Sequence, residues 1–230
     1  MRNMTVNIIV ICLMAICVSV VNGAEEEGCH PDSSDWKPLF GEDLASADYN
    51  KSVWTVSNGV LTASKDKLIW TEDAYDDFIL DLQFKTGKNA NSGVIVYCSD
   101  TGKWIPHSVE VQILDDYGEK WAEVADTWRC GGIFGHLAPA KRMVKKSGNW
   151  NRMTIKCVGP QIDVFLNGEQ TVSMDMDRWT SSKKNPDGSD IPGWLSKPLA
   201  DLPTKGKIGL QGKHGGAPIW FRNIKIKELE

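Results

Sequence analysis

The sequence lacks any long run of charge of one sign. Its 230 residues include 26 basic and 30 acidic side chains, and the formal net charge is −4. Because nucleic-acid phosphates are bound by clustered lysine and arginine, this distribution argues against a nucleic-acid partner. Hydrophobic residues make up 41% of the chain, which is too much for a disordered protein and enough for one sizeable core. We therefore expect a single globular domain.

A hydrophobic run long enough for a typical transmembrane helix is also missing. The apolar run at residues 8–21 is short for a bilayer span. It follows Arg2 and precedes the small residues Gly23 and Ala24, as in a secretory signal peptide; a retained membrane anchor is the weaker alternative. We predict a signal peptide at 1–23, a flexible segment at 24–35 and a folded domain at 36–230. These boundaries imply an exported protein, periplasmic or secreted, with no membrane span after cleavage.

Closely spaced cysteine pairs are absent among the six cysteines. This argues against a zinc knuckle or a thioredoxin-like redox site, both of which need C-x-x-C spacing. Four cysteines lie outside the predicted signal peptide: Cys29, Cys98, Cys130 and Cys157. An even number in an exported protein permits disulfides, in three possible pairings. We expect at most one structural disulfide.

No stretch has the period of an amphipathic helix of three turns. Short β-rich runs recur instead, separated by turn signals such as Asn58-Gly59 and Asn167-Gly168. The runs lie at residues 53–64, 78–85, 93–98, 108–114, 152–158, 161–172, 207–211 and 219–229. Many short strands with turn punctuation predict an all-β protein, a β-sandwich or jelly roll.

Alternation within residues 108–114 predicts a polar surface on one strand. The valines at 109 and 111 face one side, so Glu110 and Gln112 share the other side, about 7 Å apart. A solvated outer face would give the same alternation. In the last strand the hydrophobic register switches at Arg222-Asn223, which indicates a bulge. Arg222 is a candidate ligand-binding residue, with a structural salt bridge as the alternative.

Three loops carry further candidates. The Gly-rich turn at residues 210–216 contains Lys213 and His214, and a loop histidine can act as a general acid or base near neutral pH. The segment 173–206 is long, polar and rich in Pro and Gly, which is uncommon unless the loop serves a site. Trp104 and Trp194 lie in polar loop contexts and are candidates for stacking on a sugar, although core packing is the ordinary role of tryptophan.

Six motifs in order resemble the 3-keto-disaccharide hydrolase domain family. They are WKPLFGEDL at 36–44, NSGVIVY at 91–97, VEVQILDD at 109–116, GGIFG at 131–135, GNWNRMTIKCVGPQIDVFLNG at 148–168 and IGLQGKHGGAPIWFRNIKIKEL at 208–229. The resemblance spans about residue 36 to the C-terminus. It implies a concanavalin A-like jelly-roll β-sandwich of two antiparallel sheets with a glycan-facing concave surface. It also implies an exported bacterial enzyme that cleaves 3-keto-glycosides by hydrolysis or elimination, in certain cases with a divalent metal ion.

The chemistry of a 3-ketone assigns roles to these residues. The ketone acidifies the C2–H, so one base and one group that polarises the carbonyl can expel the leaving group, and water then adds. Glu110 and His214 are the candidate catalytic residues. Arg222, Lys213 or a metal ion would stabilise the enolate. The expected binders of substrate hydroxyls are Gln112, Gln211 and Asn91.

Two departures from the family pattern concern specificity. Many relatives carry Arg where this chain has Tyr97, and an aromatic residue where it has Val109. Tyr97 and Trp104 complete the expected substrate-binding set. A non-catalytic lectin-like glycan-binding module is the main alternative, and a structural cell-surface domain is the third. Metal ligands could come from Glu110, His214, Asp115 and His136, but no ligand-spacing motif supports a specific set. The resemblance also implies a partner oxidoreductase that makes the keto-sugar.

Overall fold

The computed structural model describes residues 30–230. The predicted signal peptide, the first part of the predicted flexible segment and Cys29 therefore lie outside the described residues. Within residues 30–230, no helix is long and apolar enough to cross a membrane.

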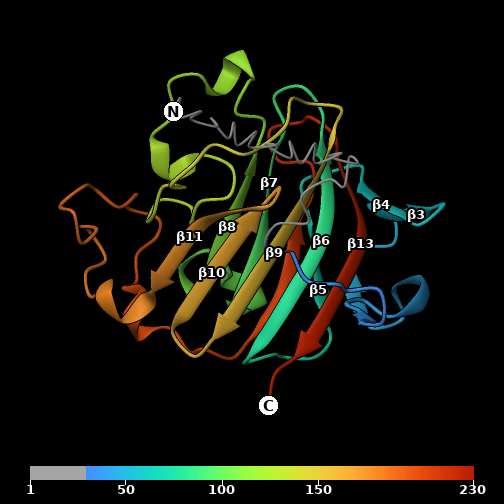
Figure 1. Ribbon diagram of the computed structural model, residues 1–230, viewed down its shortest axis with the longest axis horizontal. Helices are drawn as coiled ribbons and strands as arrows, with labels where there is room; N and C mark the ends of the chain where they lie inside the picture. The colour runs from blue at the N-terminus through green and yellow to red at the C-terminus, as the bar shows by residue number, and fades with distance from the viewer. Residues whose placement is uncertain (1–29) are drawn as a thin grey trace, which may run out of the picture.

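Two antiparallel sheets pack face to face (Figure 1), which confirms the predicted all-β jelly-roll sandwich. The first sheet has the order β11-β10-β9-β6-β13-β4-β3, and β1 pairs with β13. Its strands are β1 (Lys37–Pro38), β3 (Trp54–Ser57), β4 (Val60–Ala63), β6 (Phe78–Thr86), β9 (Trp150–Val158), β10 (Gln161–Leu166), β11 (Glu169–Asp175) and β13 (Ile219–Glu228).

The second sheet has five strands in the order β2-β5-β12-β7-β8 and lies behind the first in Figure 1. Its strands are β2 (Ala47–Tyr49), β5 (Leu68–Thr71), β7 (Asn91–Cys98), β8 (Val109–Leu114) and β12 (Lys207–Gln211). The described helices are single 3-10 turns: η1 (Glu42–Leu44), η2 (Thr101–Lys103), η3 (Ile105–His107), η4 (Glu119–Trp121), η5 (Asp126–Trp128), η6 (Met176–Arg178) and η7 (Leu199–Asp201).

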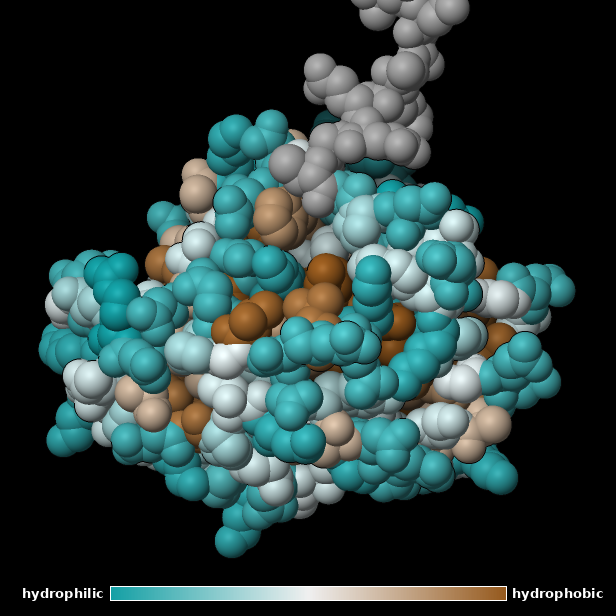
Figure 2. Space-filling view, turned by 60° about the horizontal axis from the view of Figure 1, so that its bottom comes forward, coloured by the Kyte–Doolittle hydropathy of each residue, from teal (hydrophilic) through white to brown (hydrophobic). Residues whose placement is uncertain are grey.

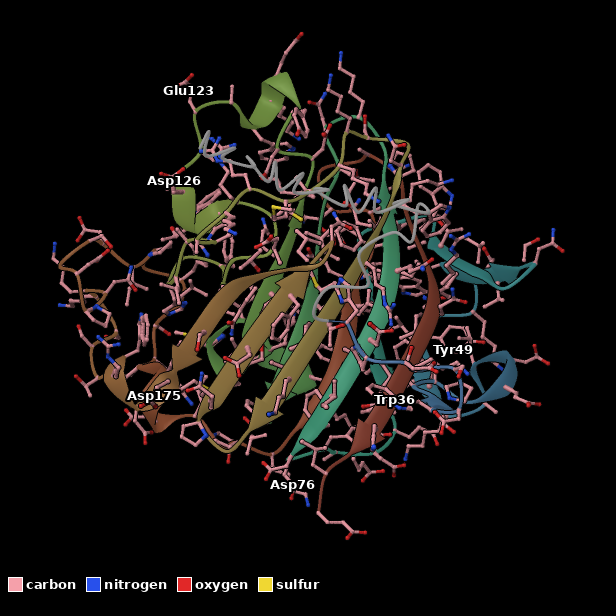
Figure 3. All side chains as sticks on the ribbon, viewed as in Figure 1. Trp36, Tyr49, Asp76, Glu123, Asp126 and Asp175 are labelled. Carbon is pink, nitrogen blue, oxygen red and sulfur yellow. The ribbon has the colours of Figure 1, made fainter. Side chains whose placement is uncertain are left out.

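The core lies between the sheets because alternate residues of both point inward. Leu80 and Leu82 of β6 and Val94 of β7 have no exposed surface and belong to one apolar cluster. Many acidic side chains lie at the periphery instead, as Asp76 and Asp126 do in Figure 3. The face in Figure 2 is mostly hydrophilic, and hydrophobic atoms gather near its centre. This segregation is what the alternating pattern of the strands predicts.

Two backbone features match the sequence expectations. Asn167 and Gly168 have φ angles of 51° and 89°, as the two-residue turn between β10 and β11 requires. The expected bulge in β13 is present, because the register against β6 shifts between Arg222 and Lys225 and Asn223 has a φ of 52°. The short strands β1, β2 and β5 were not among the predicted runs.

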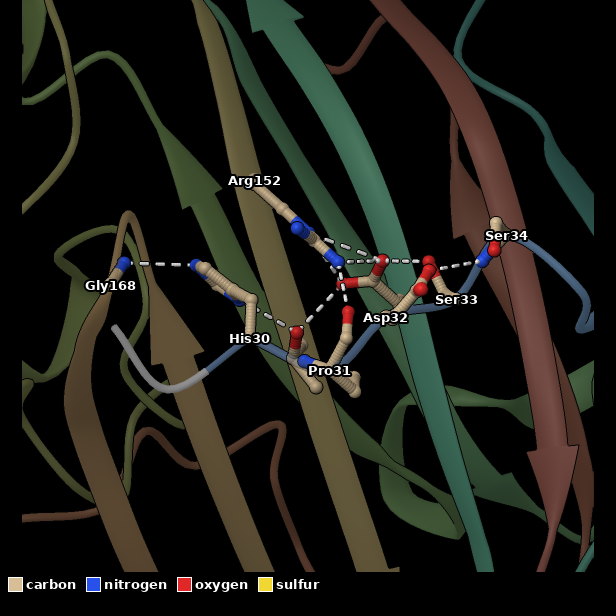
Figure 4. A network of polar contacts seen from close by, with 9 residues as sticks. His30, Pro31, Asp32, Ser33, Ser34, Arg152 and Gly168 are labelled. Atoms are coloured by element: carbon tan, nitrogen blue, oxygen red, sulfur yellow. Dashed lines mark hydrogen bonds and ion pairs between the residues drawn. The ribbon is translucent and has the colours of Figure 1, made fainter. Parts of the chain in front are cut away.

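His30, Pro31 and Ser33 hydrogen-bond to residues of the first sheet and its β10–β11 turn (Figure 4). The His30 ring nitrogens lie 2.8 Å from Thr154 Oγ1 and 2.9 Å from the Gly168 backbone nitrogen. Arg152 donates to the Pro31 carbonyl and to the buried Asp81 carboxylate. These residues fall in the segment predicted to be flexible, and its flexibility stays a prediction.

The three described cysteines are buried and unpaired: Cys98, Cys130 and Cys157. Cys98 lies on β7 and Cys157 on β9, where each fills the place of a small apolar residue.

Candidate active site

A cavity of about 640 Å³ opens on the face of the five-stranded sheet that points away from the core. Strands β5, β7, β8 and β12 form its floor, and the loops around them form its walls. Its polar lining consists of Asp66, Lys67, Asn91, Glu110, Gln112, Gln211 and His214, and its apolar lining of Leu68, Trp104, Ile105, Trp121, Trp128, Phe134, Trp194 and Leu195. This volume is typical of small-ligand sites.

The structure brings six of the nine sequence-predicted site residues to this cavity. They are Glu110, His214, Gln112, Gln211, Asn91 and Trp104. Trp194, the other candidate for stacking, also lines it, and so the segment 173–206 does border a cavity.

The Glu110 side chain extends over β7 because its diagonal neighbour there, Gly93, has no side chain. Gly93 pairs with Gln112, one position along the cavity face from Glu110. A Cβ atom on Gly93 would lie 2.2 Å from Glu110 Oε1 and 2.8 Å from its Cδ and Cγ. The Glu110 side chain therefore occupies the space that any other residue at position 93 would fill.

The environment of Glu110 favours its neutral form. Burial raises the pKa of the Glu110 carboxyl to about 8, and the nearby Asp66 carboxylate acts in the same direction. Within the described residues no hydrogen bond offsets this effect. This environment favours a protonated carboxyl, which can donate a proton.

Two turns meet at one end of the cavity and bring a histidine to an aspartate. His214 Nδ1 lies 2.7 Å from Asp66 Oδ2. The Gly212 backbone N–H donates to the Lys67 carbonyl at 3.0 Å, and a Cβ on Gly212 would lie 2.5 Å from the Lys65 carbonyl oxygen. Only a glycine at position 212 allows the two turns this approach.

The Asp66 carboxylate sets the proton arrangement of His214. A carboxylate accepts, so Nδ1 carries the hydrogen and the Nε2 lone pair of the neutral ring is left to accept a proton. Sequence reasoning missed Asp66 and Lys67. Their turn, SKDK at 64–67, is a polar stretch typical of any surface hairpin, and only the pairing of β5 with β12 brings it to His214.

Buried amides supply the remaining polar floor. Gln112 is 1% exposed, and its Nε2 donates to Asn91 Oδ1 at 3.3 Å. Its Oε1 is buried and has no partner within residues 30–230. A buried acceptor without a donor is costly, so a ligand hydroxyl at this atom would restore a lost hydrogen bond.

Tyr97 does not belong to the cavity, contrary to its place in the predicted substrate-binding set. Its φ of 56° breaks the alternation of β7, where the register against β12 shifts. The side chain turns into the core, with its ring 6.1 Å from that of Phe78. Its hydroxyl donates to the Gly159 carbonyl at 2.8 Å. Here Tyr97 is a core residue.

Arg222 and Lys213 also lie outside the cavity lining. Arg222 is on the outer face of the other sheet, where its Nε donates to Gln83 Oε1 at 2.6 Å and its guanidinium lies 4.0 Å from the centre of the Trp150 ring. The register switch that drew attention to it is real, but β13 belongs to the sheet on the far side of the core. Lys213 neighbours His214 in the turn without lining the cavity.

The four residues considered as metal ligands are not brought together. Asp115 is buried and accepts from the Asn89 backbone N–H, and His136 is buried with its Nδ1 at 2.9 Å from the Phe134 carbonyl. Neither lines the cavity with Glu110 and His214. No cluster of three or more His, Cys, Asp or Glu that could hold a metal occurs in the described part of the chain. The donor set does not fit a divalent ion, and we derive no step through one.

Comparison with solved structures places this cavity on a known scaffold. A "Putative glycosyl hydrolase" from Parabacteroides distasonis ATCC 8503 is 59% identical, with a TM-score of 0.83, and the match covers 84% of this chain and 99% of that one. A second protein with the same description and source is 24% identical over 84% of this chain and 92% of that one, with a TM-score of 0.66. A Bacillus subtilis protein described as galectin-like in fold is 12% identical, covers 84% and 94%, and has a TM-score of 0.53.

The fold and the cavity define a carbohydrate-related, glycosyl-hydrolase-like domain. The family match is specific: residues 35–227 match the 3-keto-alpha-glucoside-1,2-lyase-like domain, and the chain belongs to this family. A search of curated proteins finds no match.

Proposed function

We propose that this protein is an enzyme that cleaves the glycosidic bond of 3-keto-glycosides. The carrying observation is the combination of a carboxyl with a raised pKa, Glu110, and a histidine held by a carboxylate, His214 with Asp66, in one cavity. A protonated carboxyl can supply an acid, and a histidine whose Nδ1–H is held by a carboxylate leaves its Nε2 free to act as a base. The family description supports the keto-glycoside as substrate.

In the proposed reaction His214 is the base. Its Nε2 takes the proton from C2, and the electron pair of the broken C–H bond forms an enolate with the C3 carbonyl. The Asp66 carboxylate stabilises the resulting imidazolium, which is the role of an orienting acid beside a catalytic histidine. Lys67, a cation of the cavity lining, is the candidate to stabilise the enolate oxygen.

Glu110 is the acid of the second step. The enolate electrons form a C1=C2 double bond, the C1–O bond breaks, and the leaving oxygen takes the proton of the Glu110 carboxyl. Addition of water at C1 completes hydrolysis, and release before that addition is a lyase reaction. The unpaired Gln112 Oε1 and the neighbouring Asn91 and Gln211 would hold sugar hydroxyls.

The test compares 3-keto-glycosides with their unoxidised parents, using residues 24–230 and the Glu110→Gln variant, with and without a chelator. We expect turnover of the keto substrates alone, strong loss in Glu110→Gln, and no effect of the chelator. Turnover of the parents would indicate an ordinary glycosidase. Glycan binding without any turnover would favour the lectin-like module.

We further propose that the protein is exported through a signal peptide at residues 1–23 and acts in the periplasm or outside the cell. Its substrate requires an oxidoreductase that converts a C3 hydroxyl to a ketone. Intact-mass measurement of the exported protein tests the first point, since cleavage after Gly23 leaves residues 24–230.

A further inference from the structure

The free edge of β8 is extended by a segment that carries an aromatic residue beside Glu110. The Gly131 N–H donates to the Gln112 carbonyl, and the Phe134 N–H donates to the Glu110 carbonyl, both at 2.9 Å. Ile133 forms a bridge with Val111, and both are buried in the core. Phe134, one residue further, therefore falls on the opposite face, next to Glu110 in the cavity.

From Phe134 a chain of aromatic rings leads away from the sheet. The Phe134 and Trp128 ring centres are 4.9 Å apart at an interplanar angle of 48°. The Trp128 and Trp194 ring centres are 6.1 Å apart at 73°, an edge-to-face arrangement. We name Phe134, Trp128 and Trp194 the aromatic wall. It starts beside the proposed acid and extends beyond the polar floor.

The loop that supplies Trp194 is held in place by a buried amide. Asn185 is 4% exposed, accepts from Trp179 Nε1 at 2.9 Å and donates through Nδ2 to the Gly135 carbonyl at 3.3 Å. A Cβ on Gly135 would lie 2.5 Å from Leu195 Cδ1. The loop is thus fixed against the segment that carries Phe134, yet Trp194 is 54% exposed. Together with the half-buried Trp128 and Phe134 it forms a contiguous aromatic surface, and such patches mark ligand-binding grooves.

The aromatic wall and the floor offer different chemistry. The floor contains the amides of Asn91, Gln112 and Gln211 and the carboxyl of Glu110, which can both donate to and accept from hydroxyls. The side chains of the aromatic wall contain no acceptor. The indoles can stack on the C–H face of a sugar, but their side chains offer no acceptor to its hydroxyls, whereas a planar apolar ring can use its whole face against them.

We propose that the aromatic wall is the subsite for the leaving group and that it takes an aryl or similarly apolar aglycone in preference to a second sugar. The proposal rests on the proposed function, because the wall adjoins the Glu110 carboxyl that protonates the leaving oxygen. The sugar ring lies on the polar floor, and the aglycone extends past β8 toward Trp194.

The test measures aglycone preference separately in binding and in turnover. Calorimetry gives the affinity of unoxidised phenyl and methyl glucosides of both anomers, and kinetics give kcat/KM for the phenyl, methyl and glucosyl 3-keto-glucosides. The variants are Trp194→Ala and Trp128→Ala. The matched control is Trp220→Ala, a partly exposed tryptophan on the outer face of the other sheet. We expect the phenyl glucoside to bind about tenfold more tightly than the methyl glucoside, and Trp194→Ala to abolish most of this ratio. Trp220→Ala should leave it unchanged.

Each outcome bears on one proposal. A phenyl-to-methyl ratio near one, a preference for the glucosyl leaving group, or a ratio that Trp194→Ala leaves intact would overturn the aromatic subsite even if keto-glycosides are cleaved. An aryl preference in binding that depends on Trp194, without turnover of any keto-glycoside, would support the subsite and refute the proposed function. If Trp128→Ala does not fold, the Trp194→Ala variant alone decides between these outcomes, because Trp194 is exposed.

Discussion

Substitution of Gly93 by alanine should displace the carboxyl of the candidate acid, Glu110, without changing that residue itself. The new Cβ would lie 2.2 Å from Glu110 Oε1, whereas ordinary contacts begin at 3.4 Å. The Glu110 carboxyl must therefore retreat by about 1.2 Å, the difference of the two distances. A displacement of about 1 Å in a reacting group costs about 100-fold in rate. The colliding atoms belong to a flexible side chain, so we expect the fold to accommodate the change.

The assay is kcat/KM on a 3-keto-glycoside together with thermal unfolding of the same sample. Gly209→Ala is the contrast, because Gly209 lies on β12 in the same floor. A Cβ there would lie 2.5 Å from the Trp70 ring, a packed indole that cannot swing away, so this variant should lose stability. If Gly93→Ala keeps its activity within threefold while folded, the position of Glu110 over Gly93 does not matter for catalysis and our assignment is wrong.

Three further predictions concern protonation. The pKa of Glu110 is raised from 4.5 to about 8, so the free energy of unfolding of the wild type should fall as the pH rises between these values, and that of Glu110→Gln should lack this slope. Chemical unfolding at several pH values should show Glu110→Gln to be more stable than the wild type by about 1–3 kcal/mol at pH 8. The full pKa shift would correspond to about 5 kcal/mol, which is the upper limit. Asp66→Asn should lower kcat/KM about 100-fold, because His214 loses the carboxylate that orients it. The Asp66 charge also raises the pKa of Glu110, so the variant should shift the alkaline limb of the pH–rate profile to lower pH. An unshifted limb would show that Glu110 is not the acid. Burial lowers the pKa of His30 from 6.5, so the free energy of unfolding of the wild type should fall as the pH drops below 6.5. His30→Ala should flatten this pH dependence and cost about 1 kcal/mol of stability above pH 6.5. If the stability of both proteins depends on pH equally, neutral His30 is not the acceptor for the Gly168 N–H.

The fold was predictable because its determinants are local. Strict alternation in β6, β8 and β9 and the Asn167-Gly168 turn specify strands and a hairpin without reference to the rest of the chain. The strands β2 and β5 were missed for the opposite reason. Each is three or four residues long and exists through pairing with a distant segment, such as β5 with β12.

The site was predictable where alternation decides which face a side chain occupies, or where a loop or the family resemblance singles out a residue. Parity brought Glu110 and Gln112 to the cavity face, and their polar loop contexts singled out Trp104 and Trp194. Tyr97 was misplaced because one residue with positive φ reverses the face of the strand. Asp66 was missed because its partner His214 lies 148 positions away in sequence.

The central claim is cleavage by removal of the C2 proton. The most direct measurement is mass spectrometry of the sugar released from a 3-keto-glycoside in D2O, with the free 3-keto-sugar incubated alone as control for spontaneous exchange. The account predicts that wild-type protein releases sugar with one carbon-bound deuterium at C2, at a rate that Asp66→Asn and Glu110→Gln both reduce. Release of sugar that retains its original hydrogen at C2 would show direct displacement at C1 and would contradict the mechanism.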